Sequence, residues 1–386
     1  MSCKENATKL LILNAGCSMA FYMTIAVLAL YINQFLSIGK TAIIMAIPSI
    51  FRLFSGILMP CIDRKIALKK LGVIAVMLNA VVYMMYPMAK SFVVFIVLAS
   101  VNGLAELIYQ PTIKYMFSNL AQNDIETDYV HKIRYYSICI AGLLGPIIGG
   151  GIESFCGAKT CFLFASAIEL LMVLLFIVFI PDAQNLCIID KTQKRTSKVD
   201  KILIGYIASG FLVYFVFSQF ESVYSLALKN YFENTELIYS ILLCFNSFFG
   251  LLIQTILIKN NTKTNVCKGI VWFEIAFIIF AISFGLSLGI LFYIIGVLVY
   301  TMAEVTVIPG LDIQIDECAD ENNKMEYFAI AEIRTMGFVI GPIVFGWALD
   351  RFNAVTTCIM SVCILALAQL SNEITVKMKT YKESEK

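Results

Sequence analysis

Three carboxylates lie where charge is costly, and they are the residues of this chain with the clearest chemistry. Glu106, Glu221 and Glu304 each lie within a long run of apolar residues. If such a run crosses a membrane, the carboxylate must be protonated, paired or in contact with water. Because removal from water favours the protonated form, such a group can bind and lose a proton near neutral pH. We predict that Glu221 and Glu304 carry protons and that Glu106 binds a cationic or hydrogen-bonding ligand.

A simpler alternative is that each carboxylate only pairs with an arginine or a backbone group. Arg52, Arg134 and Arg334 are available partners in neighbouring apolar runs. Two other acidic residues in apolar runs, Glu169 and Glu274, are expected to lie at the periphery or near helix ends.

Other polar residues accompany these carboxylates at helical spacing. Asn102, Glu106 and Gln110 recur every four residues, a spacing that places them on one face of a helix. The corresponding polar residues of three further apolar runs are Asn14, Ser18 and Tyr22; Tyr214, Ser218, Glu221, Ser222 and Ser225; and Tyr300, Glu304 and Asp312. The pattern predicts four polar helix faces that together form a binding surface.

The helices that carry these faces belong to a chain that repeats itself. Arg134 is followed by Gly142, Gly145-Pro146 and Gly149, and Arg334 is followed by Gly337, Gly341-Pro342 and Gly346. Ala105-Glu106 with Pro111 recurs as Ala303-Glu304 with Pro309, a shift of 198 positions (304 minus 106). Two copies at such a shift, about half the chain length, indicate two diverged halves of one ancestral unit.

The glycine-proline segments predict where helices approach each other closely and bend. Glycines three and four residues apart let a neighbouring helix come near, and a proline removes a backbone hydrogen bond. Static packing is the alternative, but recurrence in both halves favours a moving joint. The predicted conformational residues are Arg134, Gly145, Pro146, Arg334, Gly341 and Pro342, together with Asp63 and Arg64, whose charges either latch one conformation or only anchor the topology.

Composition places the chain in a membrane. Of 386 residues, 60% are hydrophobic and 15% are charged, which leaves too little polar surface for a soluble globule. A net charge of +2 gives no general attraction to nucleic acid. Most of the 12 cysteines lie in apolar runs and are expected to act as small hydrophobic residues. With one histidine, no Cys-x-x-Cys pair, no Walker loop and no Gly-x-Ser-x-Gly, no metal, cofactor, enzyme activity or direct ATP coupling is expected.

The expected fold class is an all-α membrane protein with twelve transmembrane helices in two pseudo-symmetric bundles of six. The expected spans are residues 10–32, 41–61, 71–89, 92–117, 133–155 and 160–180, then 202–228, 236–258, 266–286, 290–312, 326–350 and 354–376. Domain boundaries follow at 1–180, a cytoplasmic linker at 181–201, and 202–386 with a short tail. Because lysines and arginines concentrate on the side that holds the linker and both termini, we expect these in the cytoplasm and the protein in the plasma (cytoplasmic) membrane.

Two motifs carry a resemblance to a known family. Gly142-x-x-Gly145-Pro146-x-x-Gly149-Gly150 resembles a signature of antiporters in the major facilitator superfamily of secondary transporters. Gly56-x-x-x-Pro60-x-x-Asp63-Arg64-Lys65 is similar to that family's loop signature between its second and third spans, with Ile66 replacing a glycine. The resemblance extends over essentially the whole chain.

Within that family, the chain is similar to proton-coupled multidrug exporters. The residues that carry this similarity are Ser218-Gln219, Gln254, and Glu304 with Pro309. It departs from them at Asn14, where many such exporters have an acid, and in lacking an arginine in the fourth span. Spans 1, 4, 7 and 10 line the central cavity in this family, and these spans carry the four polar faces described above.

The resemblance implies alternating-access transport, with proton-coupled export of a small organic molecule or drug. The partners expected are a small-molecule substrate, protons and the lipid bilayer, with no nucleic acid and a monomeric state. Two alternatives stay open: a proton-coupled importer of a nutrient such as a sugar or nucleoside, and a non-transporting membrane receptor or assembly partner.

Overall fold

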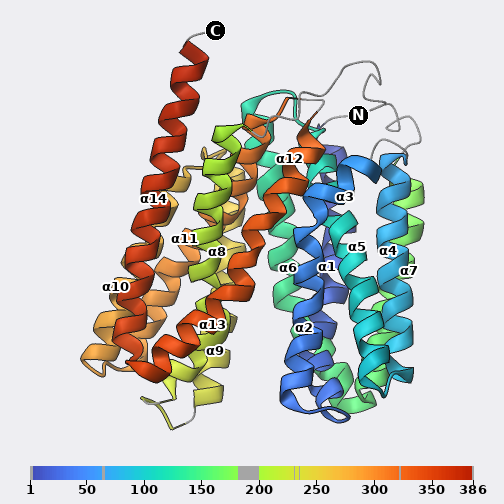
Figure 1. Cartoon of the computed structure of the whole chain (residues 1–386), viewed down its shortest axis with the longest axis horizontal. Helices are drawn as coiled ribbons and strands as arrows, with labels where there is room; N and C mark the ends of the chain where they lie inside the picture. Colours follow the sequence, from blue (N-terminus) through green and yellow to red (C-terminus); the bar gives the residue numbers. More distant parts are fainter. Residues whose placement is uncertain are drawn as a thin grey trace. The chain divides into compact units, whose positions relative to one another are not determined.

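The computed structural model describes residues 3–62, 66–180, 200–229, 231–233, 235–320 and 323–384 (Figure 1). Helices and the loops between them account for this part of the chain, without a strand. The helices divide between two compact units. Unit 1 comprises Met1–Thr196 and Ala319–Glu332, and unit 2 comprises Ser197–Cys318 and Ile333–Lys386.

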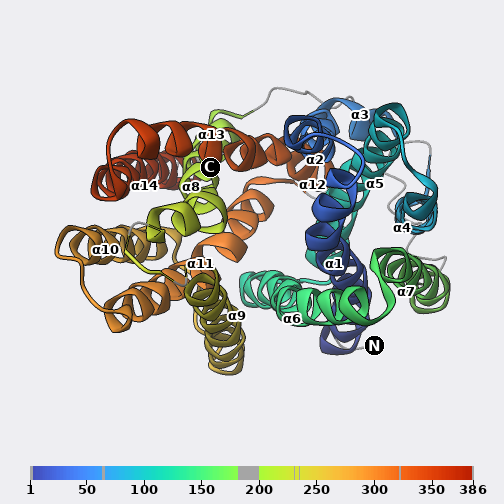
Figure 2. The same cartoon turned by 90° about the horizontal axis from the view of Figure 1, so that it is seen from below.

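Unit 1 is a bundle in which α1 packs against α6 and α7, and α5 packs against α2 and α4 (Figure 2). Its core is rich in aromatic rings, with Tyr31, Tyr86, Phe95 and Phe162 packed against one another. Its elements are α1 (Cys3–Asn33), α2 (Ile38–Leu53), α3 (Ser55–Ile62), α4 (Leu68–Met85), η1 (Tyr86–Met88), α5 (Phe92–Ser118), α6 (Asp124–Cys156), α7 (Ala158–Phe179) and α12 (Lys324–Ala331).

Unit 2 is a second helical bundle, in which α8 packs against α13 and α14, and α10 packs against α11 and α14. Its centre is a stack of aromatic rings that includes Phe217, Phe220, Phe280 and Tyr300. Its elements are α8 (Lys201–Leu228), α9 (Thr235–Lys259), α10 (Val266–Gly285), α11 (Ile290–Cys318), α13 (Met336–Arg351) and α14 (Ala354–Ser384), and the short helix η3 (Glu332–Thr335) precedes α13.

The helices agree with the expected membrane fold. Eleven described helices are long and apolar enough to span a membrane, or twelve if the pair at 43–53 and 55–62 counts as one span bent by 54°. The bend falls at Phe54, whose N–H bonds to the carbonyl of Phe51 and so tightens the last turn of α2. Because a hydropathy window does not see such a turn, the sequence predicted an unbroken span at 41–61.

Two further boundaries differ from the prediction. α6 begins at Asp124 instead of near residue 133, because Asn123 caps it: its Oδ1 accepts a hydrogen bond from the Glu126 N–H at 3.0 Å. The span expected at 326–350 is divided into α12, η3 and α13, and α12 is grouped with unit 1. The division into residues 1–180, 181–201 and 202–386 stays a prediction, since residues 181–199 lie outside the described part.

The repeated glycines lie where helices meet at backbone distance. In unit 1, a Cβ at Gly145 would lie 2.7 Å from Tyr22 Cβ, and one at Gly149 would collide with the Met23 carbonyl. In unit 2, a Cβ at Gly341 would collide with the Phe215 carbonyl. Pro146 and Pro342 lie inside α6 and α13. The close approach predicted from the glycine spacing is therefore present in both units, whereas movement at these contacts stays a prediction.

Candidate functional site

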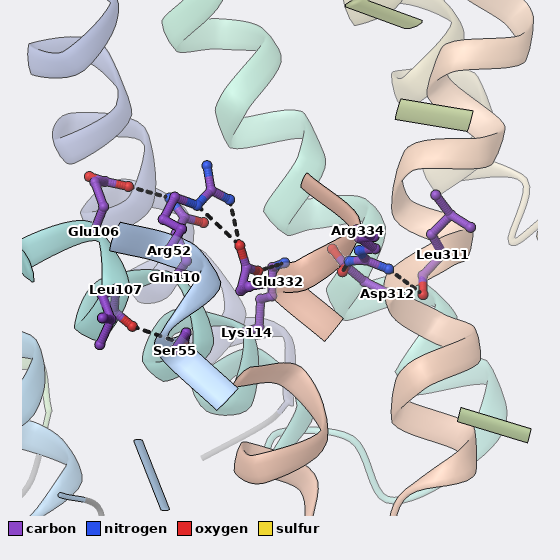
Figure 3. A network of polar contacts seen from close by, with 10 residues as sticks. All are labelled: Arg52, Ser55, Glu106, Leu107, Gln110, Lys114, Leu311, Asp312, Glu332 and Arg334. Atoms are coloured by element: carbon purple, nitrogen blue, oxygen red, sulfur yellow. Dashed lines mark hydrogen bonds and ion pairs between the residues drawn. The ribbon is translucent and has the colours of Figure 1, made fainter. Parts of the chain in front are cut away.

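Glu106 lies at the centre of an amide cluster in unit 1. Asn79 on α4 donates from Nδ2 to Glu106 Oε1 at 3.4 Å. Gln110 donates from Nε2 to Glu106 Oε2 at 2.9 Å (Figure 3). Asn102 Nδ2 in turn donates to Asn79 Oδ1 at 2.9 Å, which fixes the direction of the Asn79 amide. Both oxygens of the half-buried Glu106 thus accept hydrogen bonds from side-chain amides.

Asn14 joins three helices of unit 1 and is only 2% exposed. Its Nδ2 donates to Ser137 Oγ at 2.6 Å on α6, and its Oδ1 accepts from the Tyr109 hydroxyl at 3.0 Å on α5. The other residues of the same predicted face, Ser18 and Tyr22, are half-buried, and Tyr22 packs beside Gly145. These contacts place Asn14 in the packing of α1, and its role in binding stays a prediction.

Glu304 occupies the position in unit 2 that corresponds to Glu106, and it too is half-buried. Asn246 on α9 donates from Nδ2 to Glu304 Oε2 at 2.9 Å and to Thr301 Oγ1 at 3.0 Å. In each unit, therefore, an asparagine on a neighbouring helix holds the carboxylate.

The other predicted residues of unit 2 face the packing between helices. Tyr300 is fully buried, stacks on Phe220 and donates from its hydroxyl to the Phe217 carbonyl at 3.2 Å. Ser218 is buried with its Oγ bonded to the Phe215 carbonyl at 2.9 Å, and buried Gln219 accepts from Ser361 on α14. Their place in a substrate site stays a prediction.

A buried ion cluster within unit 1 joins Glu332 to α2 and α5. Glu332, at the start of η3, accepts from Arg52 Nε at 3.1 Å and Nη2 at 2.6 Å, and its other oxygen lies 2.5 Å from Lys114 Nζ (Figure 3). The Glu332 carboxylate is 1% exposed and Lys114 is 5% exposed. The sequence analysis missed both residues. A signal was present for Lys114, because it continues the four-residue spacing of Asn102, Glu106 and Gln110 along α5.

A second buried ion pair lies in unit 2. Arg334 binds Asp312 through Nη2 and donates from Nη1 to the Leu311 carbonyl at 3.0 Å (Figure 3). Its guanidinium also packs over the ring of Tyr214, 5.7 Å from the ring centroid. Lys114 and Asp312 are separated by the same 198 positions as Glu106 and Glu304. At this corresponding place the two units therefore carry opposite charges, each paired with a residue of η3.

These contacts bear on the alternative in which each carboxylate pairs with an arginine. Arg52 was an available partner for an intramembrane carboxylate, but it pairs with Glu332, and the partners of Glu106 are the amides of Asn79 and Gln110. Arg334 pairs with Asp312. Arg134 is buried in α6, where its carbonyl accepts from Ser137.

Some predicted residues cannot be placed. Asp63 and Arg64 lie outside the described residues. Glu221 lies in α8, but its side chain is outside the described part, as are those of Ser222 and Ser225.

The expectation that Glu169 is peripheral is wrong. Its side chain on α7 is 1% exposed, and neither carboxylate oxygen has a hydrogen-bond partner. Hydropathy alone could not show this, because a carboxylate in an apolar helix faces lipid, water or the interior according to how neighbouring helices pack. Glu274, judged peripheral on the same grounds, is half-buried in α10.

Comparison with known proteins decides the family. The family model described as Major Facilitator Superfamily matches residues 10–334, most of the chain. The chain belongs to the major facilitator superfamily. Membership makes it a multi-pass membrane protein of the secondary-transport type rather than an enzyme, with a small-molecule substrate.

Two curated members of the superfamily are similar over most of their length. The uncharacterized MFS-type transporter YqjV of Bacillus subtilis (strain 168) is 24% identical over 354 residues, 87% of this chain and 84% of YqjV. A Na(+), Li(+), K(+)/H(+) antiporter of Planococcus maritimus is 21% identical over 372 residues, 84% of this chain and 85% of the antiporter.

Solved structures of the superfamily share the fold. The crystal structure of the human organic anion transporter MFSD10 (TETRAN) matches with a TM-score of 0.80 at 13% identity, covering 96% of this chain and 100% of that one. The proton:xylose symporter XylE, bound to 6-bromo-6-deoxy-D-glucose, matches with a TM-score of 0.77 at 14% identity, covering 94% of each chain. At these identities the likeness concerns the fold alone.

Proposed function

We propose that this superfamily member is a proton-coupled antiporter that exports a small organic molecule or drug by alternating access. One observation carries the proposal. Glu106 and Glu304 occupy corresponding positions in the two halves, and each is half-buried and held by the amide of an asparagine from a neighbouring helix. Two observations support antiport, in which the substrate and protons move in opposite directions. They are the antiporter-type glycine-proline segment in α6 and the similarity to the antiporter from Planococcus maritimus.

The proposed roles follow from the hydrogen bonds. Glu304 carries a proton: when it is ionised, the Asn246 N–H stabilises the charge, and when it is protonated, the same contact weakens. Glu221, in α8, is proposed as a second carrier on its position in the sequence. Glu106 is proposed to bind a cationic or hydrogen-bonding substrate, because two amides hold its oxygens in the acceptor state.

Transport into inside-out membrane vesicles tests this function. An acid-inside proton gradient is expected to drive accumulation of a fluorescent organic cation such as ethidium by the wild-type protein. Glu304→Gln keeps the size of the side chain and removes its proton, so it is expected to abolish accumulation. Glu274→Gln on α10 is the matched control and is expected to transport like the wild type. Accumulation only in right-side-out vesicles with acid outside would favour an importer instead.

A second candidate is exchange of a monovalent metal cation for protons. The similarity to the Na(+), Li(+), K(+)/H(+) antiporter favours it, and carboxylate and amide oxygens such as those of Glu106 and Glu304 suit hard cations. In the same vesicles, Na⁺, Li⁺ or K⁺ would then dissipate the proton gradient while organic cations would not.

A further inference from the structure

The Asn246 amide in unit 2 fills a place on which two oxygen atoms of α11 converge. Its Nδ2 donates to Glu304 Oε2 at 2.9 Å and to Thr301 Oγ1 at 3.0 Å. The Thr301 hydroxyl donates its own hydrogen to the Val297 carbonyl at 2.7 Å, so Oγ1 presents a lone pair to the amide. A carboxylate oxygen and a hydroxyl lone pair therefore point at one place, which suits a positively charged occupant.

This arrangement differs from the one around Glu106 in unit 1. There both carboxylate oxygens accept from amides, and Asn102 donates to Asn79 Oδ1, which fixes the direction of that amide. In unit 2 the position that corresponds to Asn102 is Tyr300, whose hydroxyl donates to a backbone carbonyl of α8 instead. No described residue donates a hydrogen bond to Asn246 Oδ1. A half turn of the Asn246 amide, which exchanges its nitrogen and oxygen, therefore breaks only its two bonds to α11.

After that half turn, three oxygens of different kinds face the same place: a carboxylate, a hydroxyl and an amide oxygen. Oxygens of these kinds are the ligands that hard cations prefer. The described residues contain no group of three or more histidine, cysteine, aspartate or glutamate side chains that could hold a metal ion. One carboxylate with neutral oxygens therefore favours a monovalent cation over a divalent one. Since Glu304 and Asn246 are only half-buried, an ion can reach this place from the surface of unit 2.

We propose that Glu304, Thr301 and Asn246 form a binding site for one alkali cation such as Na⁺. The ion takes the place that the Asn246 amide nitrogen occupies here, and the amide turns to offer its oxygen. Thr301 corresponds to Gly103 in the repeat, so the hydroxyl ligand is absent at the equivalent position beside Glu106. The role of the site in transport rests on the second candidate function, exchange of a monovalent cation for protons, whereas the binding of the ion does not.

Equilibrium binding of radioactive Na⁺ to the purified full-length protein tests the site, with choline replacing Na⁺ to keep the ionic strength constant. The wild type is expected to bind Na⁺ saturably. Even a residue that only supports a metal ligand contributes about 10–100-fold to metal affinity, so loss of a ligand should weaken binding by about tenfold or more. Thr301→Val and Glu304→Gln, which keep the size of the side chain, are both expected to show this loss. Thr301→Ser keeps the hydroxyl and should bind Na⁺ like the wild type.

Thr306→Val is the matched control, because it makes the same change on the same helix. The Thr306 hydroxyl also donates to a carbonyl one turn back, that of Met302 at 2.8 Å, but its side chain packs against Gly269 of α10. This variant is expected to bind Na⁺ with wild-type affinity. Unchanged binding in Thr301→Val, equal weakening in Thr306→Val, or a wild type that binds no Na⁺ would each overturn the proposal.

Proton movement driven by a Na⁺ gradient in reconstituted vesicles separates the site from the transport function. If the wild type binds Na⁺ with the pattern above but moves no protons with it, the exchange of cations for protons fails and the binding site stands. If the wild type exchanges Na⁺ for protons while Thr301→Val binds Na⁺ as tightly as the wild type, the exchange stands and the proposed site is overturned.

Discussion

At the scale of single residues, the chemistry of this protein lies in how each carboxyl group is held. Glu106 and Glu304 accept hydrogen bonds from amides, Glu332 and Asp312 are paired with cations, and Glu169 has neither. The ion-paired ones are held in the charged form.

The hydrogen bond from Asn246 is expected to support the role of Glu304 in transport. Asn246→Leu removes the donor at 2.9 Å, and a hydrogen bond to a charged group contributes about 1.5–3 kcal/mol. We therefore expect gradient-driven ethidium transport by this variant to fall at least tenfold at neutral pH and to recover partly in Asn246→Gln. Transport at the wild-type rate in Asn246→Leu would contradict a role for this contact.

Sequence reasoning found some of these residues and missed others for a physical reason. Glu106 and Glu304 were identifiable because four-residue spacing and the repeat mark the same helix face twice. Glu332 was missed because it lies at a break between two helices, where spacing carries no information about its partners. Glu169 was misjudged because its burial depends on how α1, α4 and α6 pack around α7, which hydropathy does not record.

At the scale of elements, two kinds of contact hold the bundles together: glycine contacts at backbone distance and buried ion pairs. The glycine contacts were predictable from the sequence, since spacing alone signals a smooth helix face. The division of the eleventh span into α12, η3 and α13 was not, because a hydropathy window averages over the break. Glu332 and Arg334, both in η3, bind different partners.

Neighbouring glycines of α6 provide a test of the close contact with α1. A Cβ at Gly149 would collide with the Met23 carbonyl, whereas one at Gly150 has nothing within 4 Å. Gly149→Ala is expected to destabilise the protein by about 1–3 kcal/mol, as overpacked sites do, and to lower its apparent melting temperature in detergent. Gly150→Ala is the control and should leave that temperature the same or slightly higher. Equal effects of both substitutions would show that α1 and α6 are not in this contact.

The ion pair between Glu332 and Lys114 is expected to contribute to the stability of the protein, so the effects of substituting the two residues should not be additive. Lys114→Met leaves a buried carboxylate with one partner fewer, and breaking such a pair costs about 3–5 kcal/mol. The variant should therefore unfold at a lower temperature than the wild type. Combining it with Glu332→Gln should restore part of the loss, since the unpaired charge is then gone. Additive losses in the double variant would argue against the pairing.

At the scale of the whole molecule, membership in the superfamily and the two-unit architecture were both within reach of the sequence. The composition requires a membrane, and the repeat predicts two related halves. The substrate was not within reach, because the residues that select it depend on side-chain positions that the repeat does not specify. The orientation follows from the lysines and arginines and stays a prediction.

The predicted topology places both termini in the cytoplasm. A protease-cleavable tag added after the last residue should therefore be protected in intact cells and cleaved in inside-out vesicles. A tag in the loop between α7 and α8 should behave in the same way, because the basic linker is predicted on that side. Cleavage of either tag in intact cells would reverse the proposed direction of transport.

The central claim is that substrate movement and proton movement are coupled through carboxyl groups of this chain. The most direct measurement is the internal pH of sealed proteoliposomes that contain purified protein, with no proton gradient imposed and a gradient of ethidium or Na⁺ supplied. Antiport predicts that downhill movement of the active substrate drives protons in the opposite direction in the wild type and in Glu274→Gln, and that it does not in Glu304→Gln. Substrate movement without any change of internal pH in the wild type would contradict the account.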